Sequence, residues 1–159
     1  MRGVAADAGG GGLMAELAED VVERLKALCD AGDGLVEDEE FDDAVEQYWA
    51  ALELLPEPKT HWEAATLILT SIGDAHHLAG EPEAARDALE LALSCPGAAD
   101  NGFVHLRLGQ SLLEVGAKDR AAAELERAYR SAGSEIFEDE DPKYLAFLMT
   151  RMDAPPDGW

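Results

Sequence analysis

The sequence is poor in basic residues. Only 12 Lys and Arg stand against 34 Asp and Glu, which gives a formal net charge of −22 at pH 7. A surface with this charge repels nucleic acid phosphates and anionic membranes. We therefore expect no nucleic acid and no membrane as a partner. The charge favours a basic protein or peptide instead.

Cysteines and long apolar runs are scarce as well. The chain has two cysteines, Cys29 and Cys95, too few for a disulfide framework. No stretch approaches the roughly 18 consecutive apolar residues of a membrane-spanning helix. Near the N-terminus, Ala and Gly stand where a secretory leader would have an apolar run. We expect a cytoplasmic protein.

What the chain has is helix-forming sequence. Its 159 residues are 47% apolar, enough for one domain with a core, and Ala, Leu and Glu dominate over β-branched residues. Residues 1–12 end in four glycines, and residues 153–159 contain two prolines. We predict flexible tails at 1–12 and 153–159, with one helical domain over 13–152 between them.

Three glycines mark an internal repeat. Each is followed by alanines after 12 and 19 residues, in the sets Gly32, Ala44 and Ala51; Gly73, Ala85 and Ala92; and Gly109, Ala121 and Ala128. The glycines are 41 and 36 residues apart, a spacing typical of helical solenoids. Each unit is predicted to be a helical hairpin whose two helices cross where side chains are small. Gly80 and Gly116 are predicted to form the turns, and Pro82 to begin a helix.

The segment DGLVEDEEFDDAVEQYWAALELLPEP, with its Phe41, Ala44, Tyr48, Ala51 and Pro56, resembles the tetratricopeptide repeat (TPR) family. IGDAHHLAGEPEAARDALELAL and LGQSLLEVGAKDRAAAELERAY follow the same pattern. The first unit departs from it by carrying Glu39 in place of the turn glycine. The resemblance implies an all-α, right-handed α-solenoid of about three TPR hairpins plus a C-terminal capping helix.

Two segments frame the repeats. The stretch from Leu13 to Cys29 is predicted to extend the first helix towards the N-terminus. The residues between Pro56 and Thr66, which include Trp62, are predicted to lengthen the first helix of the second unit. A last helix is predicted to begin at Pro142, capped by Asp141. This helix is apolar on most sides. Two interpretations stay open: it folds into the end of the solenoid groove, or it exposes a surface for homodimer formation.

The residue patterns do not indicate an enzyme. The four histidines show no metal-ligand spacing, and neither cysteine has the surroundings of a nucleophile. We predict no catalytic residues, no metal and no cofactor. His76 and His105 are expected to pack against neighbouring helices. Six of the seven residues from Glu37 to Asp43 are acidic, which is typical of a solvated turn or of a docking surface for a basic protein.

Helical phase predicts which side chains line the concave face of the solenoid. They are Asp33, Glu37, Asp74, His77, Phe103, Gln110 and Glu114. Co-chaperones of the TPR family grip a C-terminal carboxylate on this face with Lys and Asn. Because Asp33, Asp74 and Gln110 stand where Asn would be expected, a basic partner fits better.

We therefore predict a non-catalytic interaction module with an acidic concave groove. The block from SIGDAHHLAG to EIFEDEDPKYLAFL also resembles small stand-alone bacterial TPR proteins, which implies an immunity or inhibitor role against a basic toxin. The alternative is a self-associating scaffold or adaptor that uses the apolar C-terminal helix.

Overall fold

The computed structural model describes residues 16–159, and in this range the chain forms helices and turns without strands. The seven α-helices are α1 (Glu19–Glu37), α2 (Phe41–Glu53), α3 (Glu63–Leu78), α4 (Pro82–Ala92), α5 (Gly102–Glu114), α6 (Lys118–Ala132) and α7 (Pro142–Met149). Three short 3-10 helices join them: η2 (Lys59–His61), η3 (Ala98–Asp100) and η4 (Ser134–Phe137). The all-α prediction is confirmed. The predicted tail at 1–12 lies outside the described residues.

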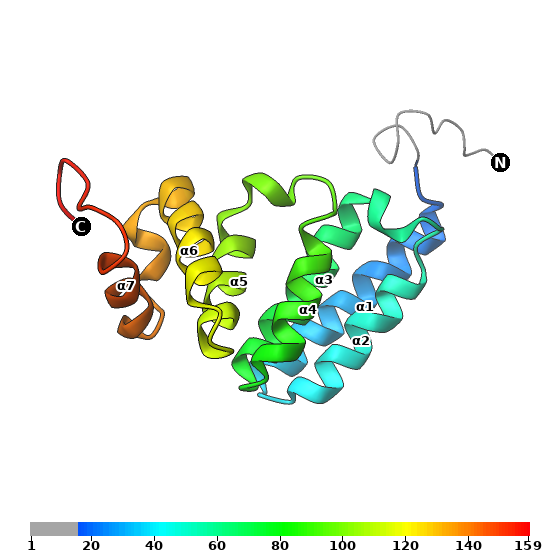
Figure 1. Ribbon diagram of the computed structural model, residues 1–159. Helices are drawn as coiled ribbons and strands as arrows, with labels where there is room; N and C mark the ends of the chain where they lie inside the picture. Colours follow the sequence, from blue (N-terminus) through cyan, green and yellow to red (C-terminus); the bar gives the residue numbers. More distant parts are fainter. Residues whose placement is uncertain (1–15) are drawn as a thin grey trace.

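Consecutive helices pair into three hairpins that stack side by side, with α7 after the third (Figure 1). The repeat glycines lie where the two helices of each hairpin cross. A Cβ atom on Gly32 would come within 2.5 Å of the Tyr48 ring, and one on Gly73 would overlap Leu89. A Cβ atom on Gly109 would likewise come within 2.7 Å of the Leu125 side chain. The predicted register is confirmed, because only glycine permits this approach.

The turns within the hairpins share one backbone geometry. Gly80 and Gly116 have φ angles of 78° and 89°, as their predicted turn role requires. Glu39 takes the same place in the first hairpin with φ 61°. A left-handed conformation is unfavourable for a residue with a Cβ atom, so the first turn carries a backbone cost that the other two avoid.

Most predicted helix boundaries hold, and two do not. Pro82 and Pro142 each begin a helix, and the Asp141 carboxylate accepts the Lys143 N–H. The first helix, however, begins at Glu19, because residues 16–18 are not helical. Of the residues predicted to lengthen α3, 63–65 do so, whereas Trp62 lies in extended backbone just before that helix, where its indole N–H donates to the carbonyl of Pro56.

The C-terminal segment packs against the third hairpin. Tyr144 and Leu148 of α7 are buried in a cluster with Leu106 and Leu125. The Trp159 ring lies 5.3 Å from the Tyr129 ring, centroid to centroid. The predicted flexibility of 153–159 stays a prediction. Among the described helices, none is both long and apolar enough to cross a bilayer.

Candidate functional site

The predicted site residues lie on the first helices of the three hairpins. α1, α3 and α5 run in the same direction, because each ends at a hairpin turn on the same edge of the molecule (Figure 1). We call the side of these helices for which Asp33, Glu37, Asp74, His77, Phe103, Gln110 and Glu114 were predicted the α1–α3–α5 face. Its two sides differ in how their charges are satisfied.

On the α1 side, the carboxylates have no cationic partner among residues 16–159. The Asp33 carboxylate accepts a hydrogen bond from the Tyr48 hydroxyl at 2.6 Å. Glu37 is exposed, and neither acid forms an ion pair with any described residue. Burial raises the pKa of Tyr48, and the hydrogen bond to Asp33 raises it further. The two acids are four residues apart and share one side of α1, where they present two negative charges to solvent.

In the middle of the face, Arg107 holds three polar side chains together. Its Nε lies 2.7 Å from Oδ1 of Asp74, and its Nη1 lies 2.6 Å from Oε1 of Glu140. Nη1 also donates to the side-chain oxygen of Gln110, whose own amide donates to Glu140 at 2.8 Å. Gln110 is fully buried. This arrangement leaves no surface of Gln110 for the partner contact that the sequence predicted.

On the α5 side, α7 supplies the partners. The Tyr144 hydroxyl donates to Glu114 at 2.6 Å, and Lys143 Nζ lies 2.7 Å from the same carboxylate oxygen. The hydrogen bond from Lys143 and then that from Tyr144 lower the pKa of Glu114. The His77 ring lies 6.2 Å from the Tyr144 ring. Burial lowers the pKa of His77, and the nearby Arg107 charge acts in the same direction.

Sequence reasoning missed the central role of Arg107 and the three groups from the C-terminal segment. Glu140, Lys143 and Tyr144 lie about 30 residues beyond their partners, so no helical spacing could connect them. The sequence left two interpretations of the last helix. The structure places it against the end of the α1–α3–α5 face.

Phe103 keeps an exposed ring at the start of α5. Its side chain is 37% exposed, and the Arg107 guanidinium lies 4.8 Å from the ring centroid. Since Arg107 also reaches Asp74, the ring lies on the side of α5 that faces α3. Phe103 therefore adds apolar surface to the face without being enclosed in the core.

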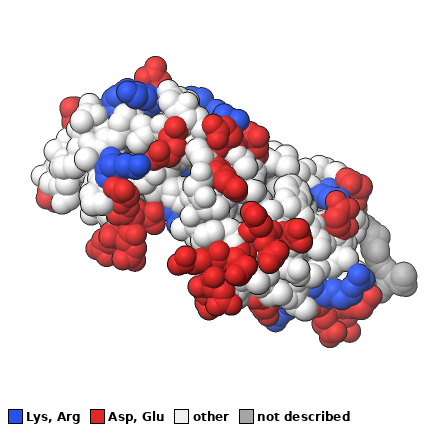
Figure 2. All heavy atoms as spheres, turned by 90° about the horizontal axis from the view of Figure 1, so that it is seen from below, with Lys and Arg blue, Asp and Glu red and all other residues white. Residues whose placement is uncertain are grey.

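The acidic turn between α1 and α2 adjoins the face. None of its six acids, from Glu37 to Asp43, forms an ion pair with a described residue. Figure 2 views the edge that carries the hairpin turns, and a broad patch of carboxylates lies near its middle. At the second acidic cluster, Asp141 caps α7 as predicted and Glu140 binds Arg107.

Two of the histidines have structural partners. His105 is buried, with one ring nitrogen 2.6 Å from Glu124 and the other 2.8 Å from the carbonyl of Ala99. His76 lies 2.7 Å from Glu81 at the turn after α3. Within the described residues, no three potential ligands converge on a metal site.

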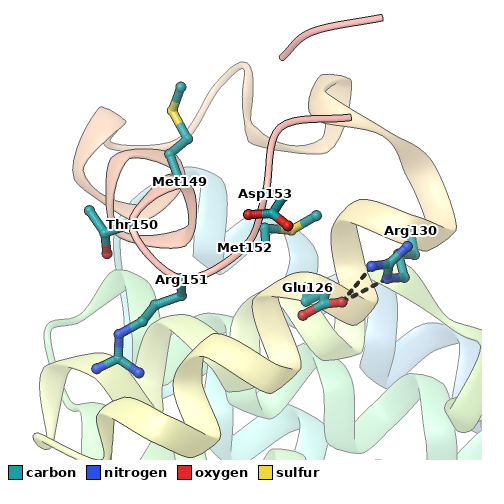
Figure 3. A pocket seen from close by; sticks show the side chains of 7 residues that line it. All are labelled: Glu126, Arg130, Met149, Thr150, Arg151, Met152 and Asp153. Atoms are coloured by element: carbon teal, nitrogen blue, oxygen red, sulfur yellow. Dashed lines mark hydrogen bonds and ion pairs between the residues drawn. The ribbon is translucent and has the colours of Figure 1, made fainter. Parts of the chain in front are cut away.

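One surface pocket of about 500 Å³ lies between α6 and the end of α7 (Figure 3). Its charged lining residues are Glu126, Arg130, Arg151 and Asp153. The two acids balance the two arginines, and Arg130 is paired with Glu126 at 2.7 Å. The pocket presents no nucleophile beside a base.

Comparisons with known proteins identify the fold. No protein-family model and no curated protein matches the chain. Among solved structures, the Yersinia enterocolitica type III secretion chaperone SycD, in complex with a peptide of the translocator YopD, matches with a TM-score of 0.63 at 14% identity. The match covers 85% of this chain and 95% of SycD.

Two TPR domains match equally well. The Sgt2 domain from Aspergillus fumigatus gives a TM-score of 0.61 at 20% identity, over 79% of this chain and 75% of that one. The second TPR domain of human RPAP3, in complex with the HSP70 peptide SGPTIEEVD, gives a TM-score of 0.61 at 15% identity. This match covers 82% of this chain and 96% of that one. The predicted architecture is confirmed: the chain has a TPR-like fold of stacked helical hairpins.

Proposed function

We propose that the protein is a non-catalytic interaction module that binds a basic segment of a partner protein on its α1–α3–α5 face. The observation that carries the proposal is the pair Asp33 and Glu37, two carboxylates on one side of α1 without a cationic partner among the described residues. A Lys or Arg side chain from a partner would supply the missing charge.

The backbone adds to the negative field at this place. The C-terminal ends of α1, α3 and α5 lie on the same edge, and each helix end carries about half a negative charge. The last turns of α1 and α5 contain no basic residue to offset it. The acidic turn beside Glu37 enlarges the same field, which would speed the encounter with a basic partner.

Two of the matched structures hold peptides, which supports a binding role for this fold. The HSP70 peptide in the RPAP3 complex is acidic, with the sequence SGPTIEEVD. An acidic peptide would meet repulsion at Asp33 and Glu37. A basic ligand therefore suits this chain better than the ligand of that neighbour.

Inhibition of a basic toxin is the specific role that we propose for this module. An inhibitor must associate quickly, and a strongly anionic surface accelerates association with a cationic target. The alternative role as a self-associating scaffold has less support. In α7, Tyr144 and Leu148 are buried within the chain, and Met149 is its exposed large apolar residue.

Peptide binding tests the proposal. Fluorescence anisotropy would compare labelled Arg-rich and Glu-rich peptides of equal length. We expect the Arg-rich peptide to bind and the Glu-rich peptide not to bind, with the affinity falling as salt is raised. The double variant Asp33→Asn/Glu37→Gln should weaken binding about tenfold, since it removes two carboxylates from the site. Asn at position 33 keeps an acceptor for Tyr48.

The control removes the same charge elsewhere. Glu46 and Glu53 are exposed acids on α2 without ion pairs among the described residues, so Glu46→Gln/Glu53→Gln should bind almost as the wild type does. Equal losses in both double variants would show that only net charge matters, and would overturn the assignment to the α1–α3–α5 face.

A further inference from the structure

The end of the α1–α3–α5 face away from the hairpin turns is apolar. Leu67 of α3 is 66% exposed and Phe103 of α5 is 37% exposed. Leu67 lies six residues before Gly73 and Phe103 six before Gly109, so they hold equivalent places on two helices that pack against each other. Burial of a leucine side chain stabilises a protein, but no described residue covers most of the Leu67 side chain.

The two apolar side chains point to the same side as the acids. Leu67 is seven residues before Asp74, almost two helical turns, so the two share one stripe of α3. Asp74 reaches Arg107, and the Arg107 guanidinium lies over the Phe103 ring. Leu67 and Phe103 thus border the same strip of surface, about 10 Å from Asp74 along the helix axis at about 1.5 Å per residue.

We propose that this face takes a segment of the partner protein that is amphipathic as well as basic. An aliphatic or aromatic side chain of the segment lies against Leu67 and Phe103, while a Lys or Arg lies against Asp33 and Glu37. The inference rests on the proposed function and adds the order and spacing of the two anchors.

The fold sets that spacing. Asp33 is level with Asp74, since each directly follows its repeat glycine, but it lies on the neighbouring first helix. If the axes of α1 and α3 are separated by about 10 Å, the smallest offset expected of neighbouring helices, Leu67 is about 15 Å from Asp33 and about 19 Å from Glu37. An extended chain covers these distances in about four to six residues at roughly 3.3 Å per residue. A segment in which the two anchors are adjacent could not reach both places.

Charge complementarity identifies a basic partner rather than a second copy of this chain as the occupant. A second copy would bring a net charge of −22 to a face that is already acidic. The C-terminal segment of the same chain is already held beside Glu114 and His77 on the other side of the face. A cationic and apolar segment matches both kinds of exposed group that remain.

A set of synthetic peptides tests the spacing. Each carries a pair of Arg residues and one Leu in a Gly-Ser background, and the separation varies from one to about nine positions. We expect the tightest binding at about four to six positions. Leu67→Gln should weaken that peptide about fivefold, because it removes an exposed apolar contact worth about 1 kcal/mol. It should not change the affinity of a peptide in which Leu is replaced by Ser.

Leu91→Gln is the matched control, since Leu91 is 43% exposed on α4, away from the α1–α3–α5 face. An affinity independent of spacing, or an equal loss in Leu67→Gln and Leu91→Gln, would overturn the inference. If Asp33→Asn/Glu37→Gln still weakens binding in that case, the proposed function stands without it. If no Arg-containing peptide binds at all, the proposed function itself is wrong.

Discussion

The two sides of the α1–α3–α5 face carry polar side chains at equivalent repeat positions, but they differ in whether these side chains have partners among the described residues. On the α1 side, Asp33 and Glu37 have no ion pairs among the described residues. In the middle of the face and on its α5 side, Asp74, Gln110 and Glu114 are held by Arg107 or by the C-terminal segment. The comparison shows that an acidic composition does not reveal which carboxylates remain available to a partner.

The difference follows from position in the solenoid. α7 lies beside the last hairpin and reaches His77 of the second, and it brings a lysine and a tyrosine to the face. The first hairpin has no such neighbour among the described residues. The same repeat unit therefore serves as structure at one end and, in our proposal, as a binding surface at the other.

The largest expected effect on the free energy of unfolding is at Arg107 of α5. Arg107→Met keeps the apolar stem but leaves Asp74 and Glu140 without their cation. Their side chains are 25% and 15% exposed. Partial exposure tempers the penalty of leaving them unpaired, so we expect a loss of about 2 kcal/mol in the free energy of unfolding, measured by urea denaturation.

Glu37→Gln on the α1 side is the counterpart, and should change stability by less than about 0.5 kcal/mol. The further substitution Glu140→Gln in the Arg107→Met background should recover part of the loss. If Arg107→Met and Glu37→Gln have equal effects on stability, the two sides do not differ as described.

The second prediction concerns pH. The pKa of His77 is lowered in the folded state, so the unfolded chain binds a proton more readily than the folded chain. Stability is then complete above the unfolded pKa of about 6.5, and is lost as pH falls from there through the folded pKa. Denaturation at a series of pH values should show this loss in the wild type.

His77→Gln should remove this part of the pH dependence, whereas His61→Gln, at an exposed position before α3, should retain it. An unchanged pH profile in His77→Gln would mean that the histidine is not desolvated beside Tyr144.

The smallest effect is expected at the turn of the first hairpin. Glu39→Gly should stabilise the protein by about 0.5 to 1 kcal/mol, because glycine adopts a positive φ without steric cost. Glu39→Gln removes the charge but keeps the Cβ atom, so it separates backbone strain from charge repulsion. If thermal unfolding shows the same gain for both variants, repulsion among the acids and not the backbone explains it.

The repeat was predictable from the sequence because its contacts lie within one hairpin. Gly73 and Leu89 meet across a single turn, at offsets that recur in every unit. The start of α1 could not be predicted in this way, because the apolar spacing of the helix continues back to Leu17, although residues 16–18 are not helical. Helical phase predicted the residues of the α1–α3–α5 face, and their role in binding stays a prediction. Helical phase could not show that the Glu140 carboxylate, from a segment outside the repeats, binds the Arg107 guanidinium.

The most direct test of the open α1 side is an NMR titration of the ¹⁵N-labelled protein with a peptide that carries Arg and Leu about five positions apart. The account predicts that amide shifts change along α1 near Asp33 and Glu37 and around Leu67, while the amides of α7 stay in place. Shift changes centred on α6 and α7, with α1 unaffected, would contradict it.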